Sequence, residues 1–212
     1  MERISIQQLK ESEDFKLVKE LRFNDILSFV LENIRLKNSV SIAFYSIVFL
    51  FLILFFAQIA TIFNQNGVSL ATFKLLGKSF WWGLISGSLL IIPIHEGLHA
   101  LGFIIVGAKK IKFGADLKQF IVYAAAENFV AGRRAFYIIA LAPIVVINLL
   151  CIPFFILGSP ETKFFLIVML LLHNIMCIGD FGMLSFFARH KEKEMYTFDE
   201  VGEKVSWFYE KK

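Results

Sequence analysis

The chain has 212 residues, of which 57% are apolar and 25 are phenylalanine. A soluble domain needs a largely polar surface, so this composition excludes an ordinary soluble protein and indicates that the lipid bilayer is the solvent. The net charge is +4, but the basic residues are spread over tails and loops instead of forming a patch with interleaved aromatic residues. We therefore expect no nucleic-acid partner.

The first 38 residues are polar and mixed in charge. They lack the short basic stretch and apolar core of a cleavable signal peptide, so we expect the first apolar segment to be a retained anchor. Within this tail, five apolar residues recur at helical spacing after Asn24, a candidate N-cap. They are Ile26, Leu27, Phe29, Val30 and Ile34. The pattern predicts an amphipathic helix that lies on the membrane surface.

Four apolar segments are long enough, at about 1.5 Å of helical rise per residue, to cross a hydrocarbon core of about 30 Å. They cover residues 42–63, 79–107, 135–158 and 164–188, and none contains Lys or Arg. The sequence therefore predicts an all-α membrane protein, a bundle of four transmembrane helices. Without an internal repeat or linker, we expect one membrane domain over 39–190, flanked by tails at 1–38 and 191–212.

The basic residues also predict the orientation in the membrane. The N-terminal tail, the second loop and the C-terminal tail together hold 19 Lys and Arg residues, whereas the first and third loops hold 3. By the positive-inside rule, both termini and the second loop lie in the cytoplasm of a multi-pass cell-membrane protein.

Two segments outside the spans show a regular pattern. Apolar and polar residues alternate over 110–118, and a short apolar run follows at 120–123, which predicts a short β-hairpin at the cytoplasmic membrane surface. The alternative is a loop that only connects two spans. Near the C-terminus, a second stripe at helical spacing predicts another anchoring or packing helix. Its residues are Phe198, Val201, Val205 and Phe208.

Ionisable residues inside the predicted spans point to a functional site. The spans contain two acids, Glu96 and Asp180, and three histidines, His95, His99 and His173. Placing a charged side chain at the bilayer centre costs about 2.5–3.5 kcal/mol even on the lenient insertion scale, so such residues usually face the protein interior and mark function.

The segment from His95 to His99 reads His-Glu-Gly-Leu-His, with the histidines four positions apart. Residues at this spacing project from the same helix face, so both imidazoles can bind one zinc ion. Glu96 points away from the ligand pair and is placed to take a proton from a water molecule. The pattern predicts a Zn²⁺ site and hydrolytic chemistry, because a buried His-Glu-x-x-His segment without a metal would leave a carboxylate in hydrocarbon.

A third zinc ligand has several candidates. A metzincin extension would require histidine at position 105, which is Ile105, and a thermolysin-type glutamate would have to be Glu127 in the basic loop. His173 and Asp180 remain, with Cys177 between them on the same predicted helix face. Both cysteines, Cys151 and Cys177, lie in spans, where a small buried side chain is their usual role, and we assign neither a chemical function.

Depth in the membrane favours Asp180. His99 precedes the basic flank at Lys109 by ten residues, or about 15 Å of helix. Asp180 precedes Arg189 by nine residues, about 13.5 Å, whereas His173 precedes it by sixteen, about 24 Å. The carboxylate also adds the negative charge that offsets Zn²⁺ in a low-dielectric site.

These residues resemble the site-2-protease-like membrane zincins, and more closely a bacterial family of short, four-span zincin peptidases. The resemblance runs from the second span to the end of the fourth. Besides the motif and Gly179-Asp180, it includes Lys112-Phe113-Gly114 and Ala140-Leu141-Ala142-Pro143. It implies that His95, His99 and Asp180 bind zinc, that Glu96 is catalytic, and that a peptide bond is cleaved in or near the membrane.

The chain departs from the site-2 protease pattern at Asp180, which follows Gly179 and precedes Phe181 instead of forming an Asp-Gly signature. Three functions follow from the sequence. The first is a membrane-embedded zinc endopeptidase that acts on a membrane protein or peptide, with residues 111–123 offering a strand edge to the substrate. The second is a non-proteolytic zinc-binding or ion-handling protein, which the single compact polar cluster disfavours. The third is a catalytically silent scaffold that keeps the motif.

Overall fold

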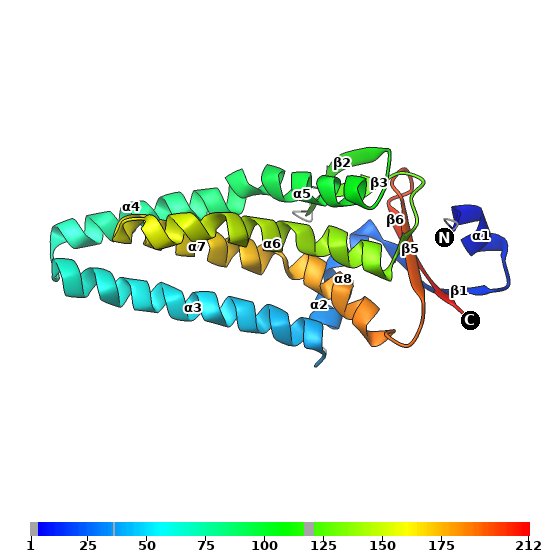
Figure 1. Cartoon of the computed structure of the whole chain (residues 1–212), viewed down its shortest axis with the longest axis horizontal. Helices are drawn as coiled ribbons and strands as arrows, with labels where there is room; N and C mark the ends of the chain where they lie inside the picture. The colour runs from blue at the N-terminus through cyan, green and yellow to red at the C-terminus, as the bar shows by residue number, and fades with distance from the viewer. Residues whose placement is uncertain (1–3, 36, 117–120) are drawn as a thin grey trace. The chain divides into compact units, whose positions relative to one another are not determined.

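The computed structural model describes residues 4–35, 37–116 and 121–212 (Figure 1). These residues form α-helices, short 3₁₀ and π turns, and two sheets. The α-helices are α1 Ile6–Glu11, α2 Ile26–Ile34, α3 Ser39–Asn66, α4 Leu70–Ile85, α5 Ile91–Ile105, α6 Arg133–Leu157, α7 Pro160–Met176 and α8 Ile178–Arg189. The strands are β1 Phe15–Arg22, β2 Ile111–Asp116, β3 Ile121–Ala126, β4 Ala131–Gly132, β5 Met195–Glu200 and β6 Val205–Lys211.

The chain divides into two compact units. The first combines Met1–Ser41, Glu96–Ala142 and Gly179–Lys212. The second combines Ile42–His95 and Pro143–Ile178.

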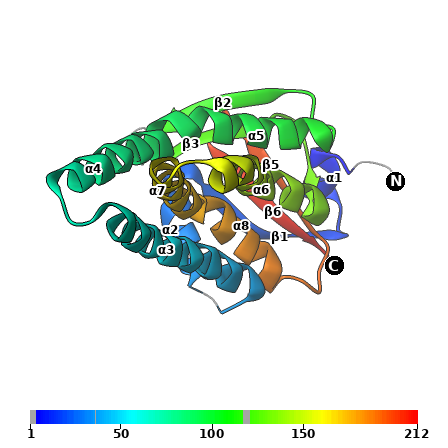
Figure 2. The same ribbon diagram turned by 60° about the vertical axis from the view of Figure 1, so that its left-hand side comes forward.

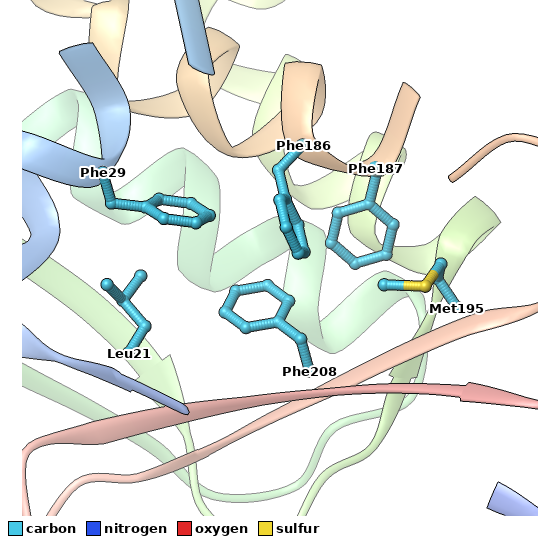
Figure 3. Packing of buried hydrophobic residues seen from close by; sticks show 6 residues of the cluster. All are labelled: Leu21, Phe29, Phe186, Phe187, Met195 and Phe208. Carbon is cyan, nitrogen blue, oxygen red and sulfur yellow. The ribbon is translucent and has the colours of Figure 1, made fainter. Parts of the chain in front are cut away.

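The first unit is built on an antiparallel sheet with the strand order β1-β6-β5-β4 (Figure 2). Helices α2 and α8 cover one face of this sheet, where aromatic rings from both helices meet residues of three strands (Figure 3). This core consists of Leu21, Phe29, Phe186, Phe187, Met195 and Phe208. Helix α1 covers the opposite face through Leu9, which packs with Phe198 and Tyr209.

This sheet corrects two predictions. The all-α fold class holds only in part, because the described residues are mostly helical but the N-terminal tail contains β1 and the C-terminal tail contains β5 and β6. The predicted C-terminal helix is wrong, since Phe198 lies in β5 and Phe208 in β6, on opposite faces of the sheet. Residues 15–22 and 195–211 form strands because they pair with each other. Such pairing between distant segments cannot be predicted from the spacing of apolar residues within one segment.

The N-terminal helix is confirmed as α2, but Asn24 lies in a 3₁₀ turn and Asp25 takes the N-cap position. Its apolar side faces protein, because Phe29 contacts Phe186 and Phe208 at ring-centroid distances of 5.1 and 6.1 Å. The helix therefore packs into the core of the first unit.

The predicted hairpin is confirmed as β2 and β3, which pair antiparallel from Ile111 with Ala126 to Asp116 with Ile121. The predicted positions at 117–120, including Lys118 and Phe120, lie outside the described residues. The Tyr123 ring covers Gly114, where a Cβ atom would lie 2.4 Å from the ring, and meets Phe23 edge-on. The hairpin is thereby packed against the N-terminal segment.

Among the described residues, three helical stretches are long and apolar enough to cross a membrane. They are α3, the 36-residue stretch from α4 to α5, and α6, and a fourth is added if α7 and α8 form one span. Many large apolar side chains on them are exposed, such as Phe49 and Phe56 at 63% and 66%. Such surfaces are unfavourable in water and suit hydrocarbon.

The fourth predicted span differs from expectation because it is not one straight helix. Helix α7 ends at Met176, its C-cap residue Cys177 has a ψ angle of 2° outside the α-helical range, and α8 continues at an angle of 43°. His173, Cys177 and Asp180 therefore do not share one helix face.

Close helix packing organises the second unit, in which α4 and α7 run side by side (Figures 1 and 2). A Cβ at Gly83 would lie 2.8 Å from the Phe165 carbonyl oxygen, and one at Gly87 would lie 2.6 Å from that of Met169. Small residues four positions apart let the two backbones approach, as in other membrane helix pairs. Gly87 belongs to a π turn, Ser86–Leu90, that joins α4 to α5.

Candidate metal centre

Helix α5 carries His95, Glu96 and His99 in its middle, away from both helix ends. The preceding π turn is a feature frequently found at functional sites, because it changes the direction in which the following side chains point. Glu96 and His99 are each 8% exposed, and His95 is half-buried. A continuous helix keeps the two histidines on one face, one turn apart.

A short contact with α6 orients the imidazole of His99. Its Nδ1 donates a hydrogen bond to the main-chain carbonyl of Ile139 at 2.9 Å. Gly102 permits this approach, because a Cβ at that position would lie 3.0 Å from the Cα of Ile139. With the proton on Nδ1, the Nε2 atom of a neutral ring carries a lone pair for a metal ion.

Asp180 meets this nitrogen from the first turn of α8. Its Oδ1 lies 3.2 Å from His99 Nε2, within the first unit. The amino-terminal end of a helix favours a negative side chain, so α8 itself stabilises the carboxylate.

Helix α8 is anchored by contacts along its length. Gly182 allows Val30 of α2 to approach, since a Cβ there would lie 2.9 Å from the Val30 Cα. Ser185 donates to the Asn33 carbonyl at 2.7 Å, and Asn38 donates to the Ser185 hydroxyl at 2.6 Å. At the far end, the Arg133 guanidinium donates to the carbonyls of three residues, namely Phe187, His190 and Lys193.

The His99 and Asp180 pair fits a zinc ion. In the neutral form of His99 with its proton on Nδ1, the Nε2 lone pair and the Asp180 carboxylate can bind one cation, whereas in the protonated form Nε2 donates to Oδ1 instead. Two ligand atoms about 2.0–2.1 Å from one tetrahedral zinc ion lie roughly 3.3 Å apart, close to the spacing of these two atoms.

A second cluster lies in the second unit. His95 Nδ1 is 3.1 Å from His173 Nε2, and Cys177 Sγ is 3.7 Å from the same nitrogen. His173 and Cys177 are both fully buried. All three ligand atoms lie within 4.8 Å of one another, close enough for one metal ion.

Comparison with known protein families assigns the chain to a family. A family model described as "Putative zincin peptidase" matches residues 88–195, which include all the side chains of both clusters. The chain belongs to this family. Neither the search of curated proteins nor the search of solved structures gave a match.

Membership of the zincin peptidase family implies zinc and a metallopeptidase activity. The structure brings Asp180 next to His99 and His173 next to His95, so the two residues left open as third ligand lie beside different histidines. Glu127, the thermolysin-type alternative, instead forms an ion pair with Lys112 beside the hairpin.

Sequence reasoning missed the Ile139 carbonyl and Asn174 and left the role of Asn148 open. The Ile139 carbonyl belongs to the main chain and leaves no sequence signal. Asn148 of α6 and Asn174 of α7 exchange side-chain hydrogen bonds of 2.8 and 3.3 Å, and Asn174 is fully buried. A buried amide inside an apolar segment is a usable signal, because it needs a partner in the bilayer.

Proposed function

We propose that the chain is a membrane-embedded zinc metallopeptidase that hydrolyses peptide bonds in or near the membrane. The proposal rests chiefly on one observation, the contact between His99 Nε2 and Asp180 Oδ1 one turn beyond Glu96. Membership of the zincin peptidase family and the apolar character of the helices support it independently.

His95, His99 and Asp180 would hold the zinc ion. His95 and His99 lie one turn apart on α5, and Asp180 reaches His99 from α8. His173 is a weaker candidate for this ion, because its Nε2 faces His95 Nδ1 and leaves His95 Nε2 for the metal. One carboxylate and two neutral imidazoles form a ligand set that is common in catalytic zinc sites.

Bound zinc would lower the pKa of a water molecule towards neutrality and polarise the scissile carbonyl group. Glu96 would accept the proton of the attacking water and pass it to the nitrogen of the leaving amine. Glu96 is buried, which shields its carboxylate from bulk solvent. The Ile139 carbonyl keeps the proton of His99 on Nδ1, which preserves the Nε2 lone pair.

The hairpin offers a binding mode for the substrate. The described part of this sheet consists of β2 and β3, so each strand has an outer edge that can pair with an extended peptide. Phe113 is 63% exposed on β2, where it can contact an apolar side chain. We propose that an unwound segment of a membrane protein or peptide adds to this edge before cleavage.

We further propose that both termini and the hairpin face the cytoplasm, from the distribution of 19 against 3 basic residues over alternate segments. The alternative function, non-proteolytic metal or ion handling, is favoured by the polar Asn148 and Asn174 pair within the apolar helices. Because these amides bond to each other, they form a closed contact, and we rank this function second.

Replacing Glu96 by Gln tests the peptidase. Cells that lack the chain would receive the wild type, Glu96→Gln or the control Glu203→Gln at an exposed position outside the hairpin, and new membrane-protein termini would be identified by mass spectrometry. We expect fragments with the wild type and control alone, while the purified Glu96→Gln protein binds zinc with wild-type affinity. Zinc binding by the wild type without any Glu96-dependent fragment would exclude a peptidase and favour the metal-handling alternative.

A further inference from the structure

His95, His173 and Cys177 combine two nitrogen donors with one sulfur donor inside the second unit. A tetrahedral zinc ion places two nitrogen ligands about 3.3 Å apart and a nitrogen and a thiolate sulfur about 3.6 Å apart. The distances in the protein are 3.1 Å between His95 Nδ1 and His173 Nε2 and 3.7 Å between His173 Nε2 and Cys177 Sγ. The distances from His173 Nε2 to His95 Nδ1 and to Cys177 Sγ thus already match those between ligands of one zinc ion.

The spacing of His173 and Cys177 explains this placement. His173 lies in the last turn of α7 and Cys177, four residues on, is its C-cap residue, whose amide donates to the His173 carbonyl at 3.1 Å. This helical bond places their side chains on one face, in the manner of two histidines of a zincin motif.

Close contacts hold that face in position. Asn174, next to His173, bonds to Asn148 of α6, which fixes the rotation of α7. Gly87 lets the π turn before α5 approach the α7 backbone at Met169. The three donors are therefore held by helix packing, so a metal ion needs little rearrangement to bind.

The chemistry of these donors differs from that of the His99 and Asp180 pair. Thiolate and imidazole select soft or borderline ions such as Zn²⁺, Cd²⁺ and Cu⁺, whereas a carboxylate favours harder ions. His173 and Cys177 are fully buried, and a ligated ion compensates for the loss of water around such groups.

We propose that His95, His173 and Cys177 form a second metal site, which binds a soft cation in addition to the proposed catalytic zinc and shares His95 with it. His95 contributes Nδ1, the ring nitrogen that the proposed catalytic site does not use. When a divalent ion binds, Cys177 releases its thiol proton and His173 keeps its proton on Nδ1. In the metal-free chain the His95 proton moves to Nε2, whereas with the catalytic zinc on Nε2 this proton is also released and His95 bridges the two ions as an imidazolate. The site needs neither Glu96 nor peptidase activity.

Cadmium titration of the purified, metal-free full chain in detergent tests this site, because a thiolate bound to Cd²⁺ gives an ultraviolet charge-transfer band. We expect one equivalent of this band in the wild type and in Cys151→Ser, the matched control at the other cysteine. Cys177→Ser should abolish it. His173→Ala should weaken cadmium binding about tenfold or more, while the control His190→Ala leaves it unchanged.

The His99→Ala variant separates this site from the catalytic one. We expect it to keep the thiolate band, because His99 is not one of the three donors. No band in the wild type, or a band that survives in Cys177→Ser, would overturn the proposal and leave the cluster as a hydrogen-bonded network. A band lost in His99→Ala would assign the thiolate to the motif zinc and also overturn a separate site. None of these outcomes depends on proteolysis, so the proposed function is tested separately by Glu96→Gln.

Discussion

Helix α5 and the α7–α8 pair carry the metal-binding side chains in contrasting ways. In α5 the helix is unbroken from Ile91 to Ile105, so its sequence spacing alone places His95 and His99 together. In the pair, the break at Cys177 separates His173 from Asp180, and the two residues lie beside different histidines. A motif within one helix specifies its own geometry, whereas ligands on either side of a break depend on the tertiary structure.

The largest expected effect concerns the side of the membrane on which Gly67 and Lys212 lie, which a reporter fusion gives as an all-or-none signal. If α7 and α8 together form one bent span, three spans separate Gly67 from Lys212, and the two positions lie on opposite sides of the membrane. Alkaline phosphatase fusions should then be active near Gly67 and inactive at Lys212, and fluorescent-protein fusions should show the reverse. The same side for both positions would mean that the pair does not cross the membrane and that the four-span topology is wrong.

The next effect concerns zinc affinity and the two candidates for the third ligand. In a Cys177→Ser background, which removes the sulfur donor, Asp180→Ala should weaken zinc binding by more than about 100-fold because a direct ligand is lost. His173→Ala should weaken it by about 10–100-fold at most, the range for residues that only orient a ligand. Competition with a chromophoric chelator measures both affinities, and the opposite ranking would assign the zinc to His173.

A smaller effect is expected for the anchor of α8. Arg133→Gln removes charged hydrogen bonds to the Phe187 carbonyl at the end of α8 and to the His190 and Lys193 carbonyls that follow it, and should lower the free energy of unfolding by about 1.5–3 kcal/mol. The neighbouring Arg134 is exposed, so Arg134→Gln should change it by less than about 0.5 kcal/mol. Denaturant titration in detergent compares the two, and equal losses would show that the guanidinium contacts contribute no stability.

The smallest effect concerns the packing that positions α7. Gly83→Ala places a methyl group 2.7 Å from Val168 Cβ, and the resulting overpacking should cost about 1–3 kcal/mol. Gly77→Ala is the matched control on the same helix, because its added Cβ meets no described atom within 4 Å. The difference in unfolding free energy between these variants isolates the contact with α7. An equal effect of both changes would contradict close α4–α7 packing.

Features that arise within one segment could be predicted from the amino-acid pattern. The length of the apolar segments predicted the helices, and the alternation of apolar and polar residues predicted the β2–β3 hairpin. The four-residue spacing predicted that His95 and His99 share one helix face. Each feature depends on residues that are close along the chain. Membership of the zincin peptidase family confirms the class of chemistry that this spacing predicted.

Only the tertiary structure decided the features that join distant segments. The tails form one sheet because β1, near the start of the sequence, pairs with β6, near its end. The local pattern of apolar residues does not indicate which distant strand is the partner. The break at Cys177 and the contact of His99 with the Ile139 carbonyl likewise depend on packing between helices. Side-chain spacing is a property of one helix, whereas the choice between Asp180 and His173 depends on where two helices meet.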